Sequence, residues 1–342
     1  MKNVILTGDR PTGHLHLGHY VGTLEQRVHL QNDPDYDMFI MIADMQALTD
    51  NIDNPQKITN SILEVMLDYL AVGIDPDKVI IFRQSGVPQL CELTMYFMNL
   101  ITVSRLERNP TIKTEIKMRG FTNEGLRAGF LMYPVSQAAD IALFNTRYVP
   151  AGEDQQSLIE LTRDIVQQFN TIYGDHFIVP ELMQSENLLC RRLPGTEGRN
   201  KMSKSLGNAI FLSDDDKTIE EKVNAMYTDP LHVRVSDPGH IEGNVPFLYL
   251  RIFAKNEHFS EYCKDYQSLD EMEEHYVRGG LGDNVVKKLL CKIIQDLIRP
   301  IRESRNTLSA NIEMVKQILE MGTMNAYEIG ADNIAKIKSK IF

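Results

Sequence analysis

The feature that most constrains the fold is an unbroken apolar run, Met38–Ala43, with polar residues on both sides. Such a run is typical of a strand in a parallel sheet that is covered on both faces. Shorter apolar, β-prone runs stand at Asn3–Leu6 and Val79–Phe82, and residues 55–70 repeat apolar side chains with a helical period. This alternation of strands and helices predicts an α/β fold with a Rossmann-like, doubly wound parallel sheet.

The length of the chain indicates two domains. The chain has 342 residues, of which 43% are hydrophobic and 24% charged, as in ordinary globular proteins. After a polar stretch near residues 213–217, helical patterns dominate to the end. We therefore predict an α/β domain over residues 1–212 and a mostly α-helical C-terminal domain over residues 213–342.

Composition limits the classes of partner. The net charge of −11 argues against a protein that coats nucleic acid non-specifically, although a local basic surface could dock one RNA. No apolar run is long enough to span a bilayer, and the first residues lack a signal-peptide core, so we expect a cytoplasmic protein without a membrane partner. The four cysteines lack the spacing of a metal clip and are assigned no role.

The first ligand signal is the turn Pro11–Tyr20, which follows a predicted strand and precedes a segment that can form a helix. Unpaired N–H groups and the helix dipole make such a helix start suitable for a phosphate. The turn, like Asp44–Gln46, falls at the carboxyl end of a strand, where ligands bind in doubly wound sheets.

Histidines and a glycine add to this signal. His16 and His19 are three residues apart and can face one ligand in a helical turn, while Gly18 lets a flat group approach the backbone. The alternatives are a chance surface cluster or a metal site. A metal site would favour histidines four apart with an acidic ligand, a spacing that the turn lacks.

The segment 199–208 is a second ligand signal, because it is basic and polar. Lys201 and Lys204 can both reach one anion, and the serines between and after them add donors. A basic loop is more often solvated surface, and the loop alone does not decide between this and a clamp on polyphosphate.

Acidic residues at two places are further candidates. Asp140 stands among apolar neighbours, so a buried carboxylate is expected there that needs a partner, either structural or a ligand donor. Gly152–Asp154 precede a helix expected at residues 155–173, where the acids could accept bonds from a ribose or simply cap the helix.

A helical segment inserted at about residues 85–125 carries an apolar, Met-rich run beside a basic one. The basic residues there are Arg105, Arg108, Lys113, Lys117 and Arg119. A solvated helix face is the default interpretation, and an interface with a second subunit that offers basic residues to RNA is the alternative.

Taken together, His16-Leu17-Gly18-His19 and Lys201-Met202-Ser203-Lys204-Ser205 resemble the two signatures of class I aminoacyl-tRNA synthetases. The segments Ala138–Asp140 and Val149–Gln155 and the total length resemble the bacterial tryptophanyl branch of that family. Many bacterial relatives differ at three positions, with Asn in place of His19, Gln in place of Arg10 and His in place of Gln46.

The resemblance implies roles for individual residues. The catalytic residues would be His16, His19, Lys201 and Lys204. The ATP contacts would be Arg10, Pro11, Thr12, Gly18, His19, Gly152, Glu153, Asp154, Arg192, Leu193, Lys201, Met202, Ser203, Lys204 and Ser205. The tryptophan contacts would be Leu6, Gln46, Tyr133, Gln137, Asp140, Val149 and Gln155, with Asp140 accepting a hydrogen bond from the indole N–H.

The activity that this resemblance implies is the ATP-dependent attachment of L-tryptophan to tRNA(Trp) through a tryptophanyl-adenylate, with AMP and diphosphate released. Mg²⁺ would accompany ATP, and no structural metal bound by the protein is expected. The inserted segment would form a homodimer interface, and the helical domain would bind the anticodon. The alternatives are the tyrosyl-specific sister enzyme, a nucleotidyltransferase without a tRNA role, and a non-catalytic RNA- or protein-binding descendant.

Overall fold

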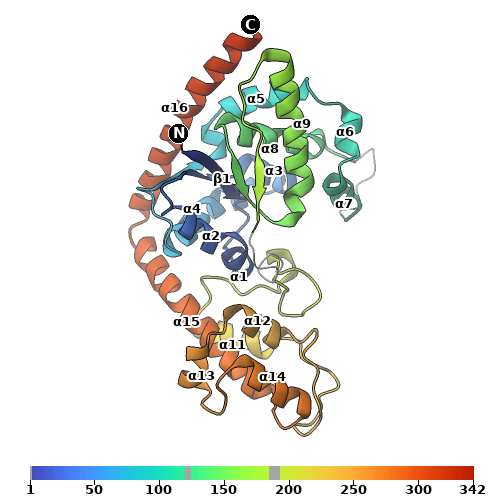
Figure 1. The fold of residues 1–342 in the computed structure, drawn as a ribbon. Helices are drawn as coiled ribbons and strands as arrows, with labels where there is room; N and C mark the ends of the chain where they lie inside the picture. The colour runs from blue at the N-terminus through green and yellow to red at the C-terminus, as the bar shows by residue number, and fades with distance from the viewer. Residues whose placement is uncertain (1, 119, 121–124, 185–192) are drawn as a thin grey trace. The chain divides into compact units, whose positions relative to one another are not determined.

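The computed structural model describes residues 2–118, 120, 125–184 and 193–342 (Figure 1). Contacts divide the chain into two compact units. The first unit contains the described residues within 1–13, 23–186 and 311–342, and the second contains those within 14–22 and 187–310. The predicted turn Pro11–Tyr20 is divided between the units, whereas Asp140 and Gly152–Asp154 lie in the first unit and residues 199–208 lie in the second.

The first unit is built on a parallel sheet of five strands in the order β3-β2-β1-β4-β5. The strands are β1 (Asn3–Asp9), β2 (Tyr36–Ile42), β3 (Val79–Arg83), β4 (Tyr148–Pro150) and β5 (Glu181–Met183). The strand order changes direction between β1 and β4, so a ligand site is expected at their carboxyl ends. The prediction of a Rossmann-like parallel sheet is confirmed.

Helices cover the sheet of the first unit (Figure 1). They are α2 (Glu25–Leu30), α3 (Asp44–Asn51), α4 (Pro55–Ala71), α5 (Gln89–Met98), α6 (Val103–Glu107), α7 (Pro110–Met118), α8 (Ala128–Leu143), α9 (Gln156–Tyr173) and α16 (Ile312–Ile341). Between sheet and helices, Phe39 of β2 packs against Phe82 of β3 and Phe144, with ring centroids 6.5 and 4.8 Å away. This buried aromatic cluster explains why β2 has the continuous apolar run.

The inserted segment is helical where the structure describes it, in α5, α6 and α7. Arg105, one of its predicted basic residues, pairs with Asp164 of α9 at 2.5 Å. Arg119 lies outside the described residues. A role of this segment in a dimer stays a prediction.

The end of the chain differs from the predicted domain division. We expected residues 213–342 to form one helical domain, but the last helix, α16, belongs to the first unit and packs on β3. A Cβ on Gly322 would lie 2.0 Å from the carbonyl oxygen of Ile81, and Thr323 Oγ1 accepts the N–H of Arg83 at 3.1 Å. Because β3 is an edge strand, the N–H of Arg83 would otherwise need a water molecule as its acceptor, and Thr323 of α16 takes that place.

The second unit is mostly helical. Its longer helices are α11 (Asp216–Asn224), α12 (Val245–Phe253), α13 (Asn256–Tyr262), α14 (Leu269–Arg278) and α15 (Asp283–Ser309). Arg302 of α15 donates to the carbonyl of Asp214 and to the carboxylate of Asp216, both at 2.8 Å. This arginine therefore holds the polar stretch near residues 213–217, which we predicted as the domain boundary, against α15.

A search of the described helices finds none that is both long enough and apolar enough to cross a membrane.

Candidate active site

The carboxyl end of β1 leads into the predicted phosphate-side turn. Within it the N–H of Thr12 donates to the carbonyl of Arg10 at 2.9 Å, and Pro11 is buried while Arg10 is exposed. Gly13 follows with a φ of 125°, a left-handed conformation that side chains with a Cβ rarely adopt. The first residues of the predicted turn are therefore closed by a local backbone hydrogen bond and a left-handed glycine.

A buried ion pair, which we did not predict, anchors the same strand end. Arg27 of α2 is 1% exposed, and its Nη1 lies 2.7 Å from Asp9 Oδ2. Tyr69 of α4 donates its hydroxyl to the same oxygen at 2.8 Å. Burial by itself would lower the pKa of Arg27, but the interactions with Asp9 and Tyr69 more than offset this effect. The pKa is therefore above its usual value, and the guanidinium stays charged. The sequence held one signal, an arginine three residues after the buried Leu24 on one helix face.

Asp140 of α8 forms the centre of the predicted amino-acid pocket and is 1% exposed, as its apolar neighbours indicated. Gln84, which follows β3, donates from Nε2 to both carboxylate oxygens at 2.9 Å. Gln46 of α3 donates to Oδ2 at 3.3 Å, and its backbone N–H donates to Gln84 Oε1 at 3.1 Å. The partner that the buried acid requires is therefore a pair of amides, and Gln84 was missed by the sequence analysis.

The environment of Asp140 sets its charge. Burial raises the pKa of this carboxyl to about 7, although the hydrogen bonds from Gln84 and Gln46 lower it. The nearby carboxylate of Asp44 adds to the rise. A neutral amide stabilises the ionised form without cancelling its charge, so the ionised carboxylate of Asp140 can accept from a ligand donor.

Other predicted tryptophan contacts lie in the same unit. Leu6 and Val149 are buried, at 3% and 7% exposure, on the neighbouring strands β1 and β4. Tyr133 of α8 donates its hydroxyl to Glu115 Oε2 at 3.1 Å, and its carbonyl accepts from Gln46 Nε2 at 3.5 Å. These contacts connect Tyr133 to the amide that reaches Asp140.

A chain of hydrogen bonds joins the amino-acid side of the pocket to the predicted ribose side. Gln137 Nε2 donates to Gln155 Oε1, and Gln155 Nε2 donates to Asp154 Oδ2, both at 3.1 Å. A Cβ on Gly152 would lie 2.6 Å from Asp154 Oδ1, so a larger residue there would displace that carboxylate. The side chain of Glu153 lies outside what the structure describes.

The two signature motifs meet in the second unit. Gly18, in the short helix α1 (Leu17–His19), donates its N–H to Met202 Sδ at 3.4 Å. A Cβ on Gly18 would lie 3.0 Å from the ring of His16, so a larger residue there would require that ring to shift. His16 donates its backbone N–H to His19 Nδ1 at 3.2 Å, and the two rings are 3.9 Å apart. The structure therefore brings together residues about 180 positions apart, as the combined signature implied.

The strand-like segment after the lysine loop holds the histidine turn in place. Leu17 donates its N–H to the carbonyl of Ile210 at 2.9 Å, and Leu212 donates to Leu15 at 3.0 Å. His16 and Phe211 form an antiparallel bridge between these bonds. The turn and the loop are thus joined by backbone as well as by side chains.

The lysine loop is fixed from within. Met202 is buried and donates its N–H to the carbonyl of Leu193 at 3.0 Å, while Asn208 Oδ1 accepts the N–H of Ser203 at 2.8 Å. Lys201 is exposed and Lys204 half-buried. Asn208, to which the sequence analysis gave no individual role, thus holds the backbone of the lysine loop. Arg192 lies outside the described residues.

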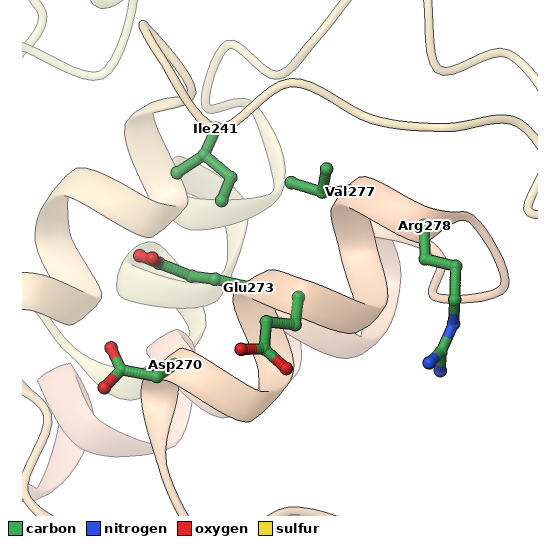
Figure 2. Close-up of a pocket in the computed structure, with 6 residues that line it drawn as sticks. Ile241, Asp270, Glu273, Val277 and Arg278 are labelled. Carbon is green, nitrogen blue, oxygen red and sulfur yellow. The ribbon is translucent and has the colours of Figure 1, made fainter.

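In the part of the chain that the structure describes, no group of three or more His, Cys, Asp or Glu could hold a metal ion. An open hollow of about 490 Å³ lies on the second unit (Figure 2), lined by Ile241, Asp270, Glu273, Glu274, Val277 and Arg278. Its carboxylates disfavour a phosphate, and it contains none of the predicted site residues.

Comparison with known proteins decides the family. Residues 1–299 match the family model of class I tRNA synthetases (W and Y). The chain belongs to this family. The predicted resemblance to class I aminoacyl-tRNA synthetases is confirmed, and the chain is an ATP-dependent enzyme of that class.

Relatives within the family include two tryptophan–tRNA ligases. That of Clostridium longisporum is 54% identical over 340 residues, covering 99% of this chain and 97% of that protein. That of Streptococcus mutans is 52% identical over 338 residues, covering 98% and 97%. The similarity extends over nearly the whole length of each chain.

Solved structures agree with this placement. The tryptophanyl-tRNA synthetase of Campylobacter jejuni, complexed with ADP and tryptophan, is 31% identical with a TM-score of 0.83 and covers 99% of both chains. The tyrosyl-tRNA synthetase of Aeropyrum pernix is 19% identical with a TM-score of 0.68, covering 94% of this chain and 90% of that one, and shows only that the fold is shared.

Proposed function

We propose that the chain attaches L-tryptophan to tRNA(Trp) through a tryptophanyl-adenylate, releasing AMP and diphosphate. The observation that carries the proposal is Asp140, a buried carboxylate with mostly apolar sequence neighbours that accepts hydrogen bonds from two amides. The identity of 54% to a tryptophan–tRNA ligase supports the same substrate. An acceptor in such a pocket suits an amino acid whose side chain is large, apolar and carries one N–H donor.

In the first step, an oxygen of the tryptophan carboxylate attacks the α-phosphorus of ATP. The bond from the α-phosphorus to the bridging oxygen breaks, and diphosphate leaves with that electron pair. Mg²⁺ would accompany ATP and would share the charge of its phosphates. This chemistry needs no protein nucleophile, so catalysis consists mainly of positioning and of charge stabilisation.

The protein groups that serve this step come from the two motifs and the β1 turn. Lys201 and Lys204 stabilise the charge that develops on the leaving diphosphate. His16 and His19 hold the ATP, and Gly18 lies under the adenine. The α-phosphate side is lined by Arg10, Pro11 and Thr12, and the ribose is framed by Gly152, Glu153 and Asp154. Leu193, Met202, Ser203 and Ser205 complete the ATP contacts, together with Arg192.

In the second step, a hydroxyl of the terminal tRNA ribose attacks the carbonyl carbon of the adenylate. The bond from that carbon to the phosphate oxygen breaks, and AMP leaves. The helices of the second unit within residues 213–310 bind the anticodon, the segment at about 85–125 forms a homodimer interface, and the enzyme works in the cytoplasm.

Amino-acid selection is the task of the Asp140 pocket. Asp140 accepts the indole N–H, while Leu6, Tyr133, Gln137 and Val149 surround the ring. Gln46 borders the acceptor, and Gln155 meets the α-amino group. A site built to pair one polar group rejects analogues that lack it by factors on the order of 10⁴–10⁵ in favourable cases.

Pyrophosphate exchange into ATP, measured with each of the twenty amino acids, tests the proposal. We expect exchange with tryptophan and charging of tRNA(Trp) by the same preparation. Exchange with tyrosine but not tryptophan would make the chain a tyrosyl enzyme. Adenylate formation without charging would support a nucleotidyltransferase, and the absence of exchange with every amino acid would support a non-catalytic protein.

A further inference from the structure

We propose that Gln84 is the positioning residue that makes Asp140 selective for an N–H donor. It fixes the direction of the carboxylate so that one acceptor position remains for the ligand. This inference rests on the proposed function and extends it, because it assigns the discrimination to a residue outside the predicted set.

The orientation of the Gln84 amide is determined by its partners. The backbone N–H of Gln46 can only donate, and it lies 3.1 Å from Gln84 Oε1. The oxygen of the amide must therefore face Gln46, which leaves Nε2 to face Asp140. At 1% exposure Gln84 is shielded from water, so reversing the amide would leave buried donors and acceptors mismatched.

The amide of Gln84 donates equally to the two carboxylate oxygens of Asp140. Gln84 Nε2 is 2.9 Å from both oxygens of Asp140, so one of its N–H groups forms a bifurcated hydrogen bond that both oxygens accept. Gln46 Nε2 adds a longer bond of 3.3 Å to Oδ2. These donors occupy three of the roughly four lone-pair sites of a carboxylate. Among the described residues, these bonds leave one lone-pair site of Asp140 for a ligand. The hydrogen bonds from Gln84 set the direction of that site.

The choice of an amide matters chemically. A Lys or Arg in place of Gln84 would pair with Asp140 and compete with a neutral N–H donor for it. A neutral donor orients the acid and favours its ionised form without cancelling the charge. The geometry therefore suits a ligand with a weak, uncharged donor, which describes an indole N–H.

Gln84→Met tests the inference, because methionine has a similar length and no donor. The readout is pyrophosphate exchange with tryptophan and with benzothienylalanine, in which sulfur replaces the indole N–H. We expect Q84M to raise KM for tryptophan about tenfold, the factor for one charge-assisted hydrogen bond. KM for benzothienylalanine and kcat for tryptophan should stay within about twofold, since neither involves the N–H contact.

Gln89→Met is the matched control. Gln89 is also a buried glutamine, at 8% exposure, near the start of α5, and takes no part in the hydrogen bonds to Asp140 described above. We expect Q89M to leave the ratio of the two KM values as in the parent enzyme. Circular dichroism melts of each variant establish folding, and Gln84→Asn, which keeps the amide one methylene short, carries the same comparison if Q84M does not fold.

The outcomes separate the two proposals. An equal rise in KM for both amino acids, or no change in either, would overturn the positioning role of Gln84 while leaving tryptophan as the substrate. A parent enzyme that fails to exchange with tryptophan would overturn the proposed function, and this inference with it.

Discussion

The pocket around Asp140 and the loop around Lys201 present their polar groups in opposite ways. In the pocket, Asp140 and Gln84 are both 1% exposed and bonded to each other. In the loop, the backbone and Asn208 are held internally, while Lys201 is exposed and Lys204 half-buried. The difference matches the two tasks that we propose: selection needs a desolvated, fixed acceptor, whereas charge stabilisation of diphosphate needs cations that meet the phosphates.

The largest effect is expected outside these two regions, at the Arg27–Asp9 ion pair of the first unit, which is held as rigidly as the pocket. Arg27→Met would leave the carboxylate of Asp9 buried without its cation. Breaking a buried pair in this way costs about 3–5 kcal/mol in free energy of unfolding. Urea unfolding should show this loss, and Lys217→Met, at an exposed surface pair, should change stability by less than about 0.5 kcal/mol. An R27M variant of unchanged stability would contradict a structural role for the pair.

A substitution in the lysine loop should lower the rate of pyrophosphate exchange. Lys204→Ala removes a cation that we place at the diphosphate, so kcat of exchange should fall on the order of 10²–10³-fold. KM for tryptophan should change little, because the amino-acid pocket is intact. Lys217→Ala is the control in the same assay. A rise in KM for tryptophan with unchanged kcat would mean that the loop acts in selection rather than in charge stabilisation.

A substitution at Asp140 should mainly weaken the affinity for tryptophan. Asp140→Asn exchanges a charged acceptor for a neutral amide, so KM for tryptophan should rise by about 10–100-fold, with a smaller change in kcat. Steady-state exchange kinetics at varied tryptophan give both constants. If kcat fell as steeply as in K204A, the separation of tasks between the two regions would be wrong.

A smaller effect should follow pH. Burial raises the pKa of Asp140 to about 7, with Asp44 of α3 adding to the rise and Cys91 of α5 also close by. The ionised carboxylate is the better acceptor and forms above that pKa, so KM for tryptophan should increase as pH falls from 8 to 6, approaching about tenfold per pH unit at the acid end. D140N should show a flat profile over this range. An unchanged KM in the parent enzyme would place the pKa of Asp140 well below 6.

Much of this organisation could be predicted because it is local. The apolar run at Met38–Ala43 predicted a buried parallel strand, and β2 occupies Tyr36–Ile42. The signature motifs predicted the family, since each is a short segment whose spacing reflects its own turn. The burial of Asp140 followed from its apolar neighbours, because an element packed on both sides has no place for water.

Only the tertiary structure decided which distant groups meet. Gln84 lies 56 residues before Asp140, and Tyr69 lies 60 residues after Asp9. Neither pairing has a local pattern, because it depends on which helices cover the same strand ends. The packing of α16 on β3 is of the same kind, since one long helical sequence does not reveal which surface it covers. A sequence can indicate that a buried charge needs a partner, but the order of the strands determines which side chain lies near enough to be that partner.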